Sequence, residues 1–158
     1  MSLKSLLFTA LFSSFAIPIQ AGPIPAREGW VVIETGKSFD HLISDLKAAT
    51  KAQGMGVVTQ AGPTGAAAKR GITIAGNRVI GVFNNDFAVK ILATSTAAMI
   101  EAPIRFYVTE NPDGLATLSY KLPSFVFAPY VSEGGTELVS LANELNQRFD
   151  TIAQQASH

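Results

Sequence analysis

The sequence of 158 residues contains no cysteine. Without thiols the chain forms no disulfide, carries no lipid-modified cysteine and offers no thiolate as nucleophile or metal ligand. Histidine is almost as scarce, with only His41 and His158 present. A histidine-built zinc or copper site within one chain is therefore not expected, and we predict neither a metal nor a cofactor.

An excess of charge of either sign is also missing. Lysine and arginine number 12, aspartate and glutamate 12, and the formal net charge at pH 7 is zero. A chain without a global field does not attract DNA or RNA, so nucleic acid is not an expected partner. Hydrophobic residues make up 47% of the chain, which is enough to build a core without disulfides.

Only the first residues form a long apolar run. Lys4 precedes an apolar stretch from Leu6 to Ile19, and Ala21 offers a small residue for signal peptidase. This layout predicts a signal peptide over residues 1–21 and a periplasmic or secreted protein. The alternative is a retained membrane anchor, but the run is shorter than the roughly 20 residues that span a bilayer. We expect no membrane span after cleavage.

The rest of the chain predicts a short extended segment, residues 22–29, and one domain over residues 30–155. Residues 30–35 and 56–60 read as strands, while 38–54, 84–95 and a segment starting near Thr136 have helical spacing of apolar residues. Gly76-Asn77 predicts a tight turn that joins strands 72–75 and 78–83 and pairs Ile74 with Val79.

A second hairpin is predicted around Asn111-Pro112-Asp113-Gly114, which suits a type I turn with Gly114 in the left-handed region. The turn pairs Phe106 with Tyr120 and makes one face of the hairpin apolar. Its other face is polar and carries Arg105, Tyr107, Thr109, Thr117, Ser119 and Lys121. The apolar face needs a cover, which predicts an α+β two-layer sandwich, a mostly antiparallel sheet with helices packed on one face.

The motifs of this hairpin resemble those of the bacterial family named domain of unknown function 302. The likeness rests on Val82-Phe83-Asn84, on residues 101–108, on the Asp113-Gly114 turn, on Leu118-Ser119-Tyr120 and on residues 123–130. The resemblance implies the same two-layer sandwich and frequent export, but no activity. Many members carry an Asp-His pair after the second strand and Gly-Asn-Pro after the phenylalanine. This chain instead reads Ala61-Gly62-Pro63-Thr64 and Asn84-Asn85-Asp86.

Candidate ligand-binding residues lie in two places. Asn84, Asn85 and Asp86 stand where a strand ends and a helix starts, where they either cap the helix through Asn85 or Asp86 or contact an anion or carbonyl oxygen. Arg105 lies opposite Lys121 on the polar hairpin face, and these two cations either bind a carboxylate or phosphate or face solvent. Tyr120 falls on the apolar face, so core packing is its default role.

The apolar segment 123–130 is the candidate partner surface. Its residues Phe125, Phe127 and Tyr130 either close the core or contact a partner. We interpret the chain as a non-catalytic periplasmic binding or interaction module. Its expected partners are a second copy in a homodimer, an unknown small molecule or an envelope protein. The alternative is an enzyme that uses Asn84, Asp86, Arg105 and Tyr120 around one cleft.

Overall fold

The computed structural model describes residues 24–158 and shows an α+β fold. The predicted signal peptide, residues 1–21, lies outside the described residues. Five strands form one sheet in the order β1-β5-β4-β3-β2, and every neighbouring pair is antiparallel. The strands are β1 (Trp30–Ser38), β2 (Gly56–Ala61), β3 (Asn77–Phe83), β4 (Ile104–Glu110) and β5 (Leu115–Lys121).

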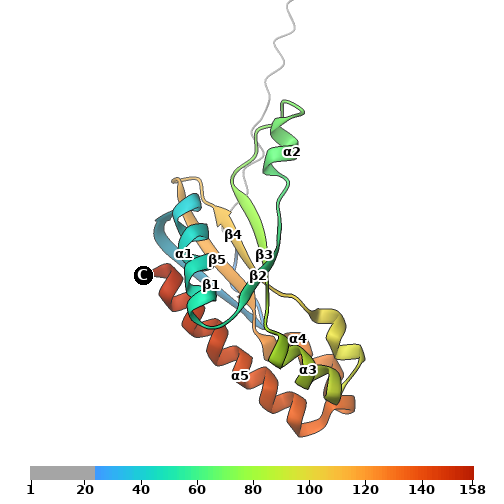
Figure 1. Cartoon of the computed structure of the whole chain (residues 1–158). Helices are drawn as coiled ribbons and strands as arrows, with labels where there is room; N and C mark the ends of the chain where they lie inside the picture. Colours follow the sequence, from blue (N-terminus) through green and yellow to red (C-terminus); the bar gives the residue numbers. More distant parts are fainter. Residues whose placement is uncertain (1–23) are drawn as a thin grey trace, which may run out of the picture.

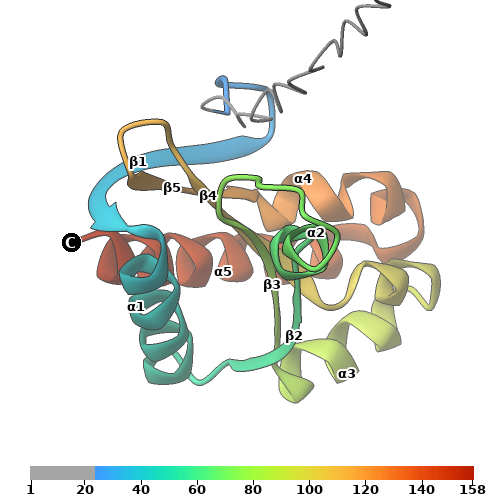
Figure 2. The same cartoon turned by 90° about the horizontal axis from the view of Figure 1, so that it is seen from above.

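Helices pack on this sheet, as the sequence predicts. The long C-terminal helix α5 lies beside α1, α3 and α4 and runs along the sheet (Figures 1 and 2). The α-helices are α1 (Phe39–Ala52), α2 (Thr64–Ala68), α3 (Asn85–Thr94), α4 (Pro123–Phe127) and α5 (Val131–Ser157), and the short 3-10 helices are η1 (Ala97–Glu101) and η2 (Ala128–Tyr130).

The β4–β5 hairpin has the predicted register. Phe106 pairs with Tyr120 and Val108 with Leu118. Gly114 adopts a φ of 82°, which is the left-handed conformation that the turn requires. Both strands lie inside the sheet, because β1 pairs with β5 and β3 pairs with β4. The hairpin is therefore the centre of the fold.

The core lies between the apolar face of this hairpin and the helices. The ring of Phe106 stacks on that of Phe149 from α5, and Tyr120 packs at an angle to both. Leu145 on the same helix is also buried. A stripe on α5 thus covers the sheet, as its spacing of apolar residues predicts.

The predicted hairpin of residues 72–75 with 78–83 is wrong. Val79 pairs with Ala61 of β2 on one side and with Tyr107 of β4 on the other. Both sides of Val79 are therefore occupied, and Ile74 does not pair with it. The segment between β2 and β3 instead holds α2 and extends beyond the ends of the other strands (Figure 1). The Gly-Asn dipeptide suggested a local turn, but β3 satisfies its hydrogen bonds with strands that are distant in sequence.

The two predicted helix starts differ in outcome. Asn84 caps α3, since its side-chain oxygen accepts from the N–H groups of Asp86 and Phe87. The sequence assigned that role to Asn85 or Asp86, one or two residues too late. In α5 the helix is interrupted at Gly135, whose φ of 59° and ψ of −154° are not helical. The uninterrupted part therefore begins at Thr136, as predicted.

The polar face of the hairpin is less solvated than its side chains suggest. Thr109, Thr117 and Ser119 are at most 2% exposed. Small side chains in central strands are covered by their neighbours on the adjoining strands. The larger side chains of Arg105 and Lys121 reach solvent on this open face of the sheet.

Candidate functional site

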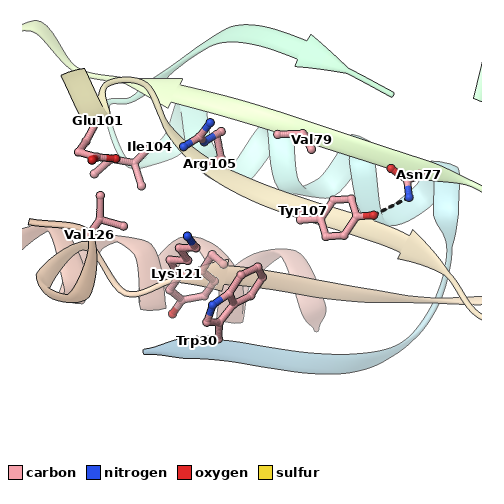
Figure 3. Close-up of a pocket in the computed structure, with 10 residues that line it drawn as sticks. Trp30, Asn77, Val79, Glu101, Ile104, Arg105, Tyr107, Lys121 and Val126 are labelled. Atoms are coloured by element: carbon pink, nitrogen blue, oxygen red, sulfur yellow. Dashed lines mark hydrogen bonds between the residues drawn. The ribbon is translucent and has the colours of Figure 1, made fainter. Parts of the chain in front are cut away.

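A hollow of about 450 Å³ lies on the open face of the sheet and borders the buried residues Ile104 and Tyr120 (Figure 3). Its walls combine aromatic, aliphatic and charged side chains. The lining residues are Trp30, Asn77, Val79, Glu101, Ile104, Arg105, Tyr107, Tyr120, Lys121 and Val126. They come from β1, β3, β4 and β5, from η1 and from α4. Most of the site therefore stands on regular secondary structure.

Two cations face this hollow. The register that pairs Phe106 with Tyr120 places Arg105 next to Lys121, and both side chains point into the hollow (Figure 3). The ion pairs within residues 24–158 are Lys37–Asp45 and Glu144–Arg148, so neither cation is neutralised by a carboxylate of the described chain. Neither Glu34 of β1 nor Glu110 of β4 forms an ion pair with Arg105.

Trp30 forms an aromatic wall beside these cations. It is the first residue of β1 and pairs with Lys121 across the strands. The Lys121 ammonium lies 5.7 Å from the centre of the indole ring, and the Arg27 guanidinium lies 5.1 Å from it. Cation–π attraction at these distances holds positive charge close to the ring. The wall is thus both apolar and electropositive.

The two ends of the hollow differ. At one end the Asn77 amide donates a hydrogen bond to the Tyr107 hydroxyl (Figure 3). At the other end Tyr130 donates a hydrogen bond of 2.8 Å to the carboxylate of Glu101. That bond, together with burial, raises the pKa of the Tyr130 hydroxyl. One end therefore carries neutral hydrogen-bonding groups, and the other carries the single acidic residue of the lining.

The predicted residues at the start of α3 lie outside the hollow lining. The Asn84 side chain makes three hydrogen bonds, since its oxygen accepts from two N–H groups of the helix and its amide donates to the carbonyl of Gly54. Asn85 and Asp86 are exposed in the first turn of α3. The structure thus gives Asn84 a structural role and leaves the other two facing solvent.

Arg105 and Tyr120 occupy opposite faces of the sheet. Tyr120 is 1% exposed, and its ring packs against Phe106 and Phe149, although it also borders the hollow. Burial, with a smaller contribution from Asp150, raises the pKa of Tyr120 to about 12. Arg105 precedes Phe106 in the strand and so projects from the other face. Arg105 and Tyr120 border one hollow, but Asn84 and Asp86 lie outside it, so the four residues of the enzyme alternative do not line one cleft.

The residues predicted to contact a partner divide into three environments. Phe127 is 2% exposed and belongs to the core, so it closes the core instead of facing a partner. Tyr130 is half-buried and bonded to Glu101. Phe125 is 43% exposed, and its ring lies against the backbone of Gly29, where a β-carbon would come within 2.2 Å of it. Of the three, Phe125 has the most accessible ring.

Comparison with known proteins places the chain in a family. The model of the family described as domain of unknown function DUF302 matches residues 31–156. The chain belongs to the DUF302 family. A similar solved structure is that of an uncharacterized conserved protein DUF302 from Bacillus stearothermophilus. The two share 15% identity and a TM-score of 0.72 over 82% of this chain and 99% of that one, which supports the fold alone. No curated protein matches.

Sequence reasoning missed several lining residues of this DUF302 domain. Trp30 lies on β1, and Asn77 and Val79 lie on β3. The sequence did not show that these strands pair with the β4–β5 hairpin, so it did not place these residues near Arg105 and Lys121. Glu101 and Val126 come from short helical segments on either side of the hairpin. The lining residues that the sequence did single out were Arg105, Tyr120 and Lys121. Once β1 is known to pair with β5, Trp30 falls beside Lys121.

Two further findings concern the described chain. Within residues 24–158, no helix has the length and apolarity needed to cross a bilayer. The same residues contain no group of three or more histidine, aspartate or glutamate side chains arranged to hold a metal ion.

Proposed function

We propose that this DUF302 domain is an exported, non-catalytic module that binds a small molecule in the hollow on the open face of its sheet. The observation that carries the proposal is the hollow itself. Its volume of about 450 Å³ suits an organic ligand, and it combines apolar walls with a few convergent polar groups. These are the features of a small-molecule site.

The position of the site supports the same conclusion. Arg105 and Tyr107 lie on β4, and Lys121 lies on β5. The packing of Phe106 and Tyr120 in the core holds these two strands from the helix-covered face of the sheet. Side chains on such rigid elements are preorganised, which lowers the entropic cost of binding a ligand.

A single spectroscopic signal tests the proposal. Trp30 is the only tryptophan, so its indole N–H gives one cross-peak in a ¹⁵N–¹H correlation spectrum of the protein. A library of small organic acids, bases and neutral compounds is added in mixtures. We expect at least one mixture to shift this peak in a saturable way, with smaller changes in the amides of α3. A library that leaves the peak in place at millimolar concentrations contradicts the proposal.

Export is part of the proposal and has its own test. We expect the full chain expressed in a Gram-negative host to be recovered from the periplasm with residue 22 at its N-terminus, since cleavage is predicted after Ala21. N-terminal sequencing of the purified protein measures this. Recovery of the intact chain in the membrane fraction would instead support the retained anchor.

The self-association predicted from the sequence is a separate proposal. Its most suitable surface is the edge strand β2, where Val58 is 53% exposed and one side of the strand has no neighbouring strand among residues 24–158. Light scattering coupled to size exclusion should show a dimer that Val58→Lys converts to a monomer. A monomer at all concentrations of the unmodified protein excludes the homodimer.

A further inference from the structure

We infer that the ligand of the hollow is an organic anion, with a single carboxylate or similar group attached to a flat apolar body. This inference rests on the proposed function, because it names the chemical class that the same site takes. Three properties of the lining lead to it.

The first property is an excess of positive charge, since the lining carries two cations and one carboxylate. Arg105 and Lys121 face the hollow from adjacent strands, and neither has a carboxylate partner within residues 24–158. A guanidinium binds a carboxylate through two parallel hydrogen bonds, and a neighbouring ammonium adds a third donor. Arg27, held near the Trp30 ring, adds to the positive potential at the same wall. An anionic group gains more here than a neutral or cationic one.

The second property is the flat apolar surface next to the cations. The side chains of Trp30, Val79 and Tyr107 line the hollow around Arg105 (Figure 3). An inorganic anion would leave these walls in contact with water, and the hollow is large enough for about ten or more non-hydrogen atoms. A planar ring or unsaturated chain buries this surface while its anionic group reaches the cations.

The third property is the position of Glu101. Its carboxylate lies at the end of the hollow opposite Tyr107 and Asn77 (Figure 3). A ligand with anionic groups at both ends would place one of them near this carboxylate, and like charges repel. The site therefore favours ligands with one anionic end over those with two.

A matched pair of probes tests the inference. Naphthalene-2-carboxylate and naphthalene-2-carboxamide have nearly the same shape and differ in charge. Each is titrated into the purified protein while the indole cross-peak of Trp30 is followed. We expect saturable binding of the carboxylate and an affinity at least about tenfold lower for the amide. Naphthalene-2,6-dicarboxylate should bind more weakly than the monocarboxylate.

Charge-removing variants locate the bound group. Arg105→Gln and Lys121→Gln should each lower the affinity for the carboxylate about tenfold and leave that for the amide nearly unchanged. Lys90→Gln is the control, because Lys90 is an exposed cation on α3 outside the hollow lining. It should change neither affinity. Matching amide spectra away from the hollow show that the variants are folded.

The outcomes separate the inference from the proposed function. If carboxamide and carboxylate bind equally, or if Arg105→Gln and Lys121→Gln bind the carboxylate as tightly as the unmodified protein, the anion preference is wrong but a small-molecule site remains. If the library and both probes leave the indole peak unmoved, the proposed function fails as well.

Discussion

Phe149 of α5 stacks on Phe106 of β4, with ring centroids 4.6 Å apart and ring planes 16° apart. The contact joins the C-terminal helix to the centre of the sheet across more than forty residues of chain. Arg105 directly precedes Phe106 in β4, so the same packing also sets the position of this cation of the hollow on the opposite face.

Removing this contact should destabilise the fold strongly. Phe149 is 0% exposed, so Phe149→Ala creates a cavity and should lower the free energy of unfolding by about 3–5 kcal/mol. Phe125→Ala is the matched control, because Phe125 is 43% exposed and should cost about 1 kcal/mol. Urea unfolding followed by circular dichroism measures both. Equal losses would contradict the placement of Phe149 in the core.

The cap of α3 is the second testable contact. Asn84 accepts from two backbone N–H groups, so Asn84→Ala should lower the free energy of unfolding by about 1 kcal/mol. Asn85 is exposed in the next position, and Asn85→Ala should change stability by less than about 0.5 kcal/mol. Thermal unfolding of the two variants distinguishes them. A larger loss of stability in Asn85→Ala than in Asn84→Ala would show that Asn85 is the capping residue, as the sequence suggested.

A close backbone approach at Gly62 gives a third prediction. A β-carbon there would lie 2.1 Å from the carbonyl oxygen of Asn77, so Gly62→Ala should force β2 and β3 apart and cost about 1–3 kcal/mol. Gly65 in α2 has open space around its α-carbon. Gly65→Ala should therefore be neutral or raise stability by up to about 1 kcal/mol. Chemical denaturation of both variants provides the comparison, and tolerance of alanine at 62 would refute the β2–β3 contact.

Tyr120 predicts how stability changes at alkaline pH. Burial raises its pKa from 10.0 to about 12 in the folded protein. The folded state thus holds the phenol proton more tightly than the unfolded state. The associated stability is fully present below pH 10 and is lost as pH rises toward 12, by about 3 kcal/mol in total.

The Tyr120 prediction is measured as a difference between variants. Between pH 9 and 11.5, the free energy of unfolding of Tyr120→Phe should fall less steeply than that of the unmodified protein. Tyr107→Phe, which changes a hydroxyl on the open face, should keep the steep fall. Identical slopes for Tyr120→Phe and the unmodified protein would show that this hydroxyl titrates normally.

Local patterns predicted the fold well where they depended on short-range chemistry. The 111–114 turn determined the register of the central hairpin, and the stripe on α5 identified its buried face. The predicted pairing of Ile74 with Val79 was wrong. It rested on the turn-like Gly76-Asn77 dipeptide alone, and the sequence does not show that β2 and β4 pair with β3 instead. Strand order is a long-range property that alternation within one strand does not encode.

The same limit applies to the candidate site. Arg105 and Lys121 were recognised because one hairpin brings them together, whereas Trp30 joins them only through the pairing of β1 with β5. Asn84 was recognised as part of a helix start. Which of Asn84, Asn85 and Asp86 caps the helix depends on their backbone angles, and the sequence does not determine these.

The hollow is lined by residues from interior strands and from an edge strand of the sheet. Arg105 belongs to a strand with neighbours on both sides, whereas Trp30 is the first residue of the edge strand β1, which in the described part of the chain has a neighbour on one side only. Fraying of β1 would withdraw the indole from the cations, and a bound molecule that contacts both Trp30 and Arg105 would hold β1 to the interior of the sheet. Occupancy should therefore slow amide hydrogen exchange along β1 more than along β4.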